Sequence, residues 1–188
     1  MAIDCNEIYV GGSMANLASD YDPGDGTVLI GGGQGGQGGQ ESWISKFNTS
    51  GELQWAKTFG NTSADRVNGM AASGGNVYAT GYHTGNGGDF DTGAGTIALA
   101  SSHYEPYIIK LNSAGATQWA VTVDTEVGAS NGKPAGEGIV VDGSGNVYTA
   151  GNYRGTADLG SGSGVADFTA YAGTSMDQAS PLIIPHTQ

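Results

Sequence analysis

Apolar and polar residues alternate in short segments along this chain. In residues 107–111, Tyr107, Ile109 and Leu111 are predicted to lie on one face of an extended segment, with Ile108 and Lys110 on the other. A period of two is typical of β-strands. Glycine-containing turns such as SGEL (50–53) and SAGA (113–116) separate such segments. No segment shows the apolar stripe of a helix, with a period of about 3.6, so we expect almost no helix.

One pattern occurs three times. Its most distinctive element is a tyrosine-containing strand, found as NEIYVGG (6–12), GNVYATGY (75–82) and GNVYTAGN (145–152). Tyr9, Tyr78 and Tyr148 lie 69 and 70 residues apart, and each is followed three residues later by a glycine. Self-similarity at a fixed spacing predicts a repeat architecture in which each unit packs on its neighbours.

The other elements of the repeat follow each tyrosine in a constant order. An acidic turn comes first, as DYDPGDGT (20–27), DFDTGAGT (89–96) and the weaker TADLGSGS (156–163). An apolar strand follows, as SWISKFNTSG (42–51), PYIIKLNSAG (106–115) and PLIIPHTQ (181–188). The last element is a Gln-Trp strand, ELQWAKTFG (52–60) and ATQWAVTVD (116–124), of which no third copy is present.

The chain is therefore expected to be a single repeat domain, residues 1–188. Its repeats cover roughly residues 1–60, 61–124 and 125–188, and the last is incomplete. A further strand precedes each tyrosine, so each unit has four short strands, the composition of a β-propeller blade. We predict an all-β protein of tandem four-stranded antiparallel blades. About three blades do not close a ring, because a propeller typically has about 4–8.

The order GNVYATGY, DFDTGAGT and PYIIKLNSAGATQWA resembles the SBBP repeat of bacteria, the seven-bladed β-propeller type. The resemblance covers nearly the whole chain. It implies a propeller fold and large secreted or surface proteins of bacteria, and it implies no common enzyme activity.

Composition and charge exclude several classes of function. The chain has 35 glycines, and its net charge of −12 comes from 18 acidic and 6 basic residues. This acidity argues against binding to nucleic acid or to anionic membranes. No apolar run is long enough for membrane insertion. Cys5 is the only cysteine, so no disulfide forms within the chain, and we expect it to be an inert small residue.

The acidic turns are the candidate metal site. Calcium binds several carboxylate oxygens in one loop, and Asp20, Asp22 and Asp25, or Asp89 and Asp91, could supply them. The EF-hand pattern fails, because a glycine stands at the fifth position of the loop. The preferred interpretation is a turn capped by Asp side chains, since it also explains the third copy. Calcium binding is the alternative, and no other cofactor is expected.

Other candidate motifs have simpler structural explanations. The glycine-rich stretch GGGQGGQGGQ (31–40) contains G-x-G-x-x-G, but a strand follows it rather than the helix that a dinucleotide site requires, so a loop is expected. The three histidines are not spaced as zinc ligands, and His83, His103 and His186 are expected on the surface. The three tryptophans Trp43, Trp55 and Trp119 could stack on sugars, but core packing is preferred. Asn48 and Asn61 begin N-glycosylation sequons.

The sequence therefore predicts a structural or interaction protein and no enzyme, with no catalytic residue. The expected setting is an extracellular or cell-surface assembly of a bacterium, an oligomer or a filament, whose partners are copies of the chain or neighbouring blades. One alternative is a carbohydrate-binding propeller module, and another is a fragment of a larger propeller enzyme. Both ends of the repeat array are unfinished, so chain–chain contacts are expected near Met1–Cys5 and Pro181–Gln188.

Overall fold

The computed structural model describes residues 1–15, 18–30, 39–61, 63–85, 87–101, 103–125, 133–152, 157–158 and 180–184. These residues form antiparallel pairs of strands with turns between them and contain no helix, which confirms the all-β prediction. Within these described residues, no sheet closes on itself.

Three sheets contain most of the strands. The first sheet has the order β1-β2-β5-β6, the second β7-β8-β11-β12, and the third β14-β15-β17. The first sheet is built from β1 (Ala2–Asp4), β2 (Glu7–Ala15), β5 (Gln40–Asn48) and β6 (Leu53–Phe59). The second contains β7 (Arg66–Ser73), β8 (Asn76–Thr84), β11 (Tyr104–Leu111) and β12 (Thr117–Thr122). The third contains β14 (Ala135–Val141), β15 (Val147–Asn152) and β17 (Ser180–Ile184).

Two-stranded pairs project from these sheets. They are β3 (Ser19–Asp20) with β4 (Leu29–Ile30), β9 (Gly88–Asp89) with β10 (Ala98–Leu99), and β13 (Asp124–Thr125) with β16 (Ala157–Asp158). The hairpins β3–β4 and β9–β10 each leave a sheet between its second and third strands. Each corresponds to an acidic turn of the sequence repeat.

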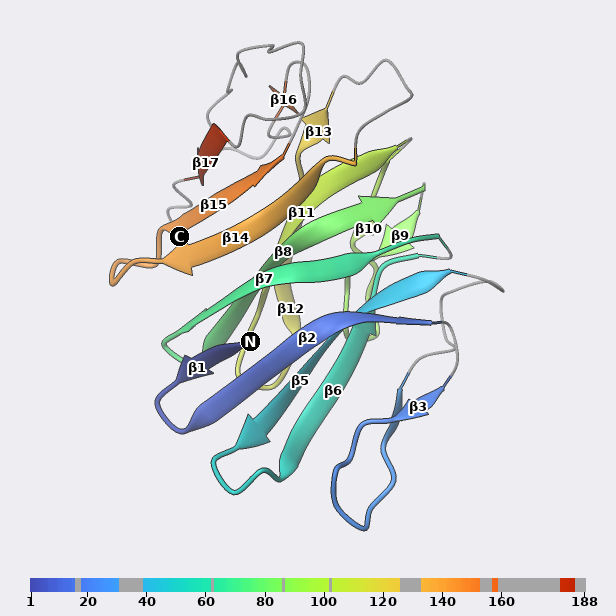
Figure 1. Cartoon of the computed structure of the whole chain (residues 1–188), viewed down its shortest axis with the longest axis vertical. Helices are drawn as coiled ribbons and strands as arrows, with labels where there is room; N and C mark the ends of the chain where they lie inside the picture. The colour runs from blue at the N-terminus through green and yellow to red at the C-terminus, as the bar shows by residue number, and fades with distance from the viewer. Residues whose placement is uncertain are drawn as a thin grey trace.

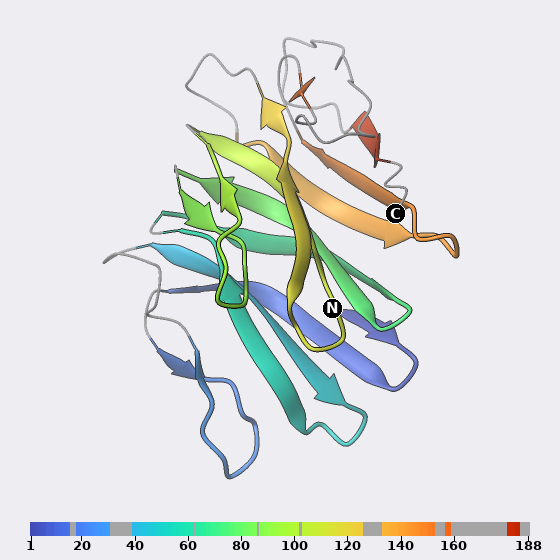
Figure 2. The same ribbon diagram turned by 180° about the vertical axis from the view of Figure 1, so that it is seen from behind.

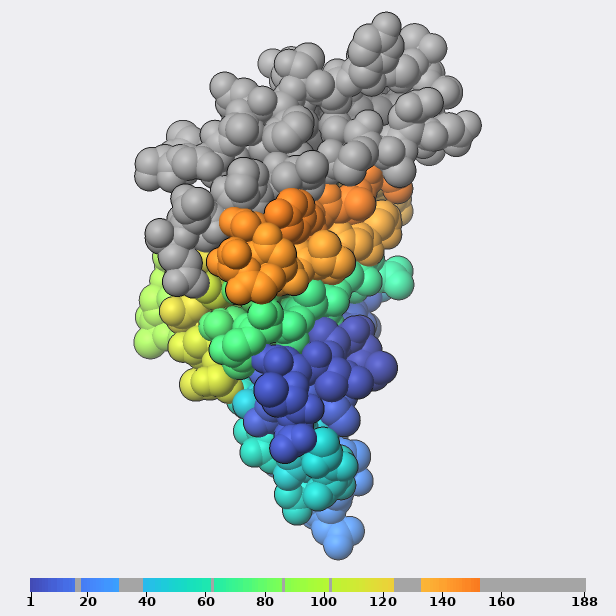
Figure 3. Space-filling view, turned by 90° about the vertical axis from the view of Figure 1, so that its left-hand side faces the viewer, coloured from blue at the N-terminus to red at the C-terminus, as the bar shows by residue number. Residues whose placement is uncertain are grey.

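The three sheets are stacked in chain order along the long axis of the molecule (Figure 1), and the view from behind shows the same order (Figure 2). In the second and third sheets, the first strand packs on the sheet before it. Strand β7 contacts β1, β2 and β5, and β14 contacts β7, β8 and β11. The β3–β4 hairpin forms the tip of the molecule at the end away from the third sheet (Figure 3).

The repeated tyrosines take equivalent places in the three sheets. Tyr9, Tyr78 and Tyr148 all lie on the second strand of their sheet. Their register partners on the first strand are Ala2, Ala71 and Val140. Their partners on the third strand are Lys46, Lys110 and Ile183. The predicted equivalence of the tyrosines is confirmed.

The third strand of the third sheet is shifted relative to the sequence alignment. Matching PLIIPHTQ to PYIIKLNSAG places Pro181 at the position of Pro106, whereas the pairing of β17 with β15 places it at the position of Ile108. The alignment is therefore wrong by two residues. A shift of two keeps every side chain on the same face of a strand, so alternation of apolar residues cannot detect it.

Three of the turns between neighbouring strands share one construction. Asn48 is the last residue of β5, and Asn112 directly follows β11. Each side-chain oxygen accepts two backbone N–H bonds from the turn, all at 3.0 Å. Gly51 and Gly115 in these turns have φ of 81° and 78°, in the left-handed region that glycine adopts without strain. Asp142 caps the turn between β14 and β15 in the same way. The predicted turns are confirmed.

The glycine after each tyrosine has a steric reason in two sheets. A Cβ atom at Gly81 would lie 1.8 Å from the carbonyl oxygen of Arg66, and one at Gly151 would lie 2.2 Å from that of Ala135. In both sheets the adjoining first strand contains a β-bulge at this level. At Gly12 of the first sheet the nearest atom would be 3.5 Å away. Only the second and third sheets therefore require glycine at this position.

Two apolar clusters lie between the sheets. The first joins the first and second sheets and includes Tyr9, Ile44, Phe59, Val77, Phe90, Tyr107, Ile109 and Leu111. The second joins the second and third sheets and includes Tyr78, Ile108, Val123, Ile139 and Val147. As predicted, Tyr107 and Ile109 face one neighbour while Ile108 faces the other. Full burial of each large side chain contributes about 1.5–3 kcal/mol.

The Gln-Trp strands contribute to both clusters. Trp55 is partly buried, and its Nε1 donates to the carbonyl oxygen of Ser113, in the second sheet, at 3.0 Å. A Cβ atom at Gly115 would lie 2.9 Å from the indole ring of Trp55. Lys46 also reaches Ser113, with Nζ 3.3 Å from the same carbonyl oxygen. Trp119 packs against the second cluster with its ring centroid 6.4 Å from that of Tyr78.

Candidate functional site

The acidic turn at 20–27 is held by its own aspartates. The Oδ1 atom of Asp20 accepts hydrogen bonds from the backbone N–H groups of Asp22, at 3.0 Å, and Val28, at 2.9 Å. The Oδ1 atom of Asp22 accepts one from Gly24 at 2.9 Å. The bonds from Asp22 and Val28 lower the pKa of Asp20, so its carboxylate remains ionised.

The β9–β10 hairpin repeats this arrangement. The Oδ1 atom of Asp89 accepts from the N–H groups of Asp91, at 2.9 Å, and Ile97, at 3.1 Å. The Oδ1 atom of Asp91 accepts from Gly93 at 2.7 Å. The expectation that aspartate side chains cap these turns is confirmed in both hairpins.

The same aspartates were the candidate calcium ligands. The second carboxylate oxygens of Asp22 and Asp91 each stand 2.2 Å from where a Cβ atom of the last glycine in their turn would lie, so the carboxylates fold back over the turn. Asp25 is exposed. Among the residues that the structure describes, no group of three or more His, Cys, Asp or Glu side chains is placed to hold a metal ion. Calcium binding therefore stays a prediction.

Buried polar side chains lie between the first and second sheets. Asp65 is fully buried, and its carboxylate accepts the N–H groups of Asn61, at 2.5 Å, and Thr84, at 3.2 Å. Burial raises the pKa of Asp65 to about 7, with a smaller contribution from the charge of Glu41, although the two backbone bonds oppose the rise. The connection between the two sheets is thus organised around one carboxyl group.

His83 is fully buried, and its expected place on the surface is wrong. Its Nε2 lies 2.9 Å from Oγ1 of Thr122, and its ring packs edge-on against Phe90, with centroids 5.3 Å apart. Burial lowers the pKa of His83 to about 4. Alternation along β8 places residue 83 on the same face as Val77 and Ala79, so this burial could have been inferred from the period-two pattern.

Tyr107 completes this buried group. Its hydroxyl lies 3.2 Å from Oγ of Ser42, in the first sheet, and donates to the carbonyl oxygen of Arg66 at 3.2 Å. Burial raises the pKa of Tyr107. Because Asp65, His83 and Tyr107 are all fully buried, they are enclosed from solvent in this structure. Tyr107 links the second sheet to the first, whereas His83 is bonded within the second sheet.

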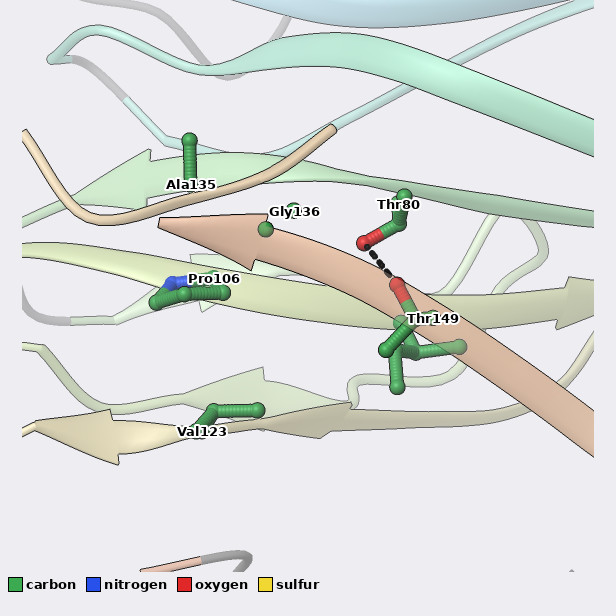
Figure 4. A pocket seen from close by; sticks show the side chains of 8 residues that line it. Thr80, Pro106, Val123, Ala135, Gly136 and Thr149 are labelled. Atoms are coloured by element: carbon green, nitrogen blue, oxygen red, sulfur yellow. Dashed lines mark hydrogen bonds between the residues drawn. The ribbon is translucent and has the colours of Figure 1, made fainter. Parts of the chain in front are cut away.

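A small cavity lies between the second and third sheets (Figure 4). Its volume is about 10 Å³, and its lining includes Thr80, Pro106, Val123 and Thr149. Oγ1 of Thr149 lies 3.4 Å from Oγ1 of Thr80 across it. This is space for about one water molecule, so the cavity is too small for an organic ligand.

The remaining sequence motifs are not brought together into a site. Asn61 is 5% exposed, and its side-chain Nδ2 donates to the carbonyl oxygens of Thr84 and Gly85, so this sequon is inaccessible. Nδ2 of the other sequon asparagine, Asn48, donates to Glu52 at 2.6 Å. Cys5 is exposed. Residues 31–38 of the glycine-rich stretch and His186 lie outside the described residues.

The face of the first sheet turned away from the second sheet carries apolar side chains that are only partly covered. We call this the head face, formed by Ile3, Ile8, Tyr21, Val28, Ile30, Trp43 and Phe47. Ile3 is 61% exposed and Val28 is 37% exposed. Tyr21, from the β3–β4 hairpin, packs against Trp43 with ring centroids 4.8 Å apart.

Each head-face position has a counterpart in the second sheet. By register and hairpin geometry the counterparts are Ala72, Val77, Phe90, Ile97, Leu99, Tyr107 and Leu111. All of them belong to the first apolar cluster or pack against it, because the first sheet covers them. The aromatic pair Phe90 and Tyr107 is the counterpart of Tyr21 and Trp43, and both of its members are fully buried.

The opposite end of the stack shows the complementary pattern. Val140 and Tyr148 of the third sheet, which we call the tail face, are counterparts of Ala2 and Tyr9 in the first sheet. Ala2 and Tyr9 are buried beneath the second sheet, at 9% and 0% exposure. Val140 is 61% exposed and Tyr148 is only partly buried. Sequence reasoning placed unfinished surfaces at the ends of the array but did not identify these side chains.

Comparison with known proteins adds no further candidate. No protein-family model matches the chain, and no curated protein matches it. In the described part of the chain, no helix has the length and apolar character needed to cross a membrane.

Proposed function

We propose that this protein is a structural or interaction protein built of β-propeller-type blades, working in an extracellular or cell-surface assembly of a bacterium. The resemblance of its repeats to the SBBP repeat supports the blade interpretation and the setting. The stacking in chain order of two four-stranded and one three-stranded antiparallel sheets is consistent with it.

The buried groups support a structural role. The side chains that carry acid–base chemistry between the first two sheets, Asp65, His83 and Tyr107, are fully buried. Tyr107 contacts Ser42 of the first sheet, and Asp65 holds the connection between the sheets through Asn61. His83 is bonded within the second sheet, to Thr122. The aspartates of the hairpins accept hydrogen bonds from their own turns. These groups hold the sheets and hairpins in place.

The observation that carries the proposal is the head face. The same set of positions belongs to the core or packs against it in the second sheet and is only partly covered in the first, yet it carries mostly large apolar residues in both. Contiguous apolar side chains that stay partly exposed on a protein surface are typical of contacts with other proteins. The net charge of −12 keeps such a protein soluble while these contacts form locally.

The test is the mass of the purified chain in solution over a wide range of concentrations, by light scattering and sedimentation velocity. Assembly into oligomers or filaments is the expected result, and electron microscopy distinguishes the two. A monodisperse monomer at high concentration, with no change in mass, would contradict the assembly role and favour a fragment of a larger propeller.

A carbohydrate-binding module is the second candidate, and one feature favours it. Tyr82 and Tyr104 are partly exposed and lie 5.2 Å apart between ring centroids, with Nζ of Lys133 5.0 Å from the ring centroid of Tyr104. Partly exposed aromatic rings can stack on sugar rings. A glycan array tests this candidate, since binding that is lost in Tyr104→Ala would support it.

A further inference from the structure

We infer that the head face of one copy of this chain binds the tail face of a second copy, so that copies join head to tail. The inference rests on the proposed assembly function and specifies its contact. It follows from an interface that the molecule already contains, that between its own first and second sheets.

The internal interface shows what the head face is built to receive. In the second sheet the corresponding positions are covered by the face of the first sheet that lies opposite its head face. On that covering face, Phe59 packs on Phe90 and Tyr107 at centroid distances of 5.5 and 5.9 Å. The covering face also carries Ala2 and Tyr9. The natural occupant of a head face is therefore the opposite face of a sheet of the same repeat.

The tail face is the corresponding surface at the other end of the stack. Within the molecule, β7 packs on β1, β2 and β5, and β14 packs on β7, β8 and β11. Continuing this relation places β1 of a second copy on β14 and β15. Ile3 of β1 and Val140 of β14 would then meet, which explains why two large apolar side chains are each 61% exposed on opposite ends of one molecule.

The contact is heterologous, because two different surfaces meet. Such contacts build rings when the rotation closes and filaments when it does not. An association of two identical head faces would instead give a closed dimer with two-fold symmetry. These two arrangements respond differently to single-face variants.

The experiment uses Ile3→Asp to block the head face, Val140→Asp to block the tail face, and Leu29→Asp as a matched control. Leu29 is 62% exposed and its counterpart in the second sheet, Ala98, is exposed as well, so this position lies outside the internal interface. All three substitutions add the same charge at similarly exposed sites. Trp43→Glu is a second head variant, and thermal unfolding verifies that each variant is folded.

The expected result is that Ile3→Asp and Val140→Asp are each monomeric alone, whereas Leu29→Asp assembles like the unmodified chain. Mixing the two monomeric variants should restore one intact contact and give a one-to-one dimer that grows no further. Dimers of Val140→Asp alone would show head-to-head association and overturn the inference. If neither Ile3→Asp nor Val140→Asp changes assembly, the head-to-tail inference is overturned while the proposed assembly function stands. If the unmodified chain stays monomeric, both the inference and the proposed function are overturned.

Discussion

The buried pair of Asp65 and His83 makes a specific prediction about stability and pH. Asp65 has a pKa of about 7 in the folded protein against an ordinary value of 3.8, so its favourable contribution is present below 3.8 and is lost as the pH rises towards 7. His83 has a pKa of about 4 against an ordinary 6.5, so its contribution is present above 6.5 and is lost as the pH falls towards 4.

The two effects oppose each other over the same range. Between about pH 4 and 6.5 the folded protein holds the proton on Asp65 and the unfolded chain holds it on His83, so the pair binds the same number of protons in both states. The pair alone therefore gives the unmodified protein almost no change of stability in this range. One pKa unit corresponds to about 1.4 kcal/mol, so removing one partner exposes a change of about 3 to 4 kcal/mol from the other.

The measurement is urea unfolding followed by tryptophan fluorescence at several pH values from about 4 to 7. Relative to the unmodified protein, the free energy of unfolding of Asp65→Asn should increase by about 3 kcal/mol as the pH rises over this range, because only His83 then titrates. His83→Gln should lose about 4 kcal/mol over the same range, from Asp65 alone. The readout is the change in the free energy of unfolding with pH rather than its absolute value, because either substitution also lowers stability by disturbing buried hydrogen bonds. Parallel pH profiles for the three proteins would refute the reasoning.

Three further predictions concern the repeat. Gly81→Ala should lower the free energy of unfolding by about 1–3 kcal/mol or more, because its Cβ atom would lie 1.8 Å from the Arg66 carbonyl oxygen. Gly12→Ala, at the same position of the repeat, should be nearly neutral. Equal urea midpoints for the two variants would contradict this prediction. Trp119→Ala should lower the melting temperature through a loss of about 3–5 kcal/mol, and an unchanged midpoint would mean that the indole packs on nothing. EDTA should barely change the melting temperature, because backbone N–H groups already occupy the Oδ1 atom of Asp89, and a calcium-dependent rise that is absent in Asp89→Ala would restore the metal interpretation.

Much of the architecture follows from the sequence because the relevant interactions are local. Alternation with a period of two fixes which side chains share a face, and this correctly separated Tyr107 and Ile109 from Ile108. Asn and Asp cap turns through bonds to their own neighbours, so Asn112 and Asp89 could be assigned without knowledge of the rest of the fold. The spacing of the tyrosines gave the equivalence of the three sheets.

Other features depend on which surfaces meet. The burial of His83 and the raised pKa of Asp65 arise because the first sheet covers the second, and no property of residues 65 or 83 alone shows that covering. The register of Pro181 was missed by two residues, since such a shift leaves the pattern of faces unchanged. Gly81 and Gly12 occupy the same position in the sequence repeat, but only at Gly81 would a Cβ atom collide with a carbonyl oxygen of the neighbouring strand.

The head face shows most clearly the difference between what the sequence determines and what the tertiary structure decides. The sequence places Tyr21, Trp43 and Phe47 in repeated segments, and it predicted core packing for Trp43. Only the stacking of the sheets decided that their counterparts Phe90 and Tyr107 are core and that they themselves are not, because burial is a property of two surfaces in contact. A repeated sequence specifies the same face in every unit, and the position of the unit in the stack decides whether that face becomes core or surface.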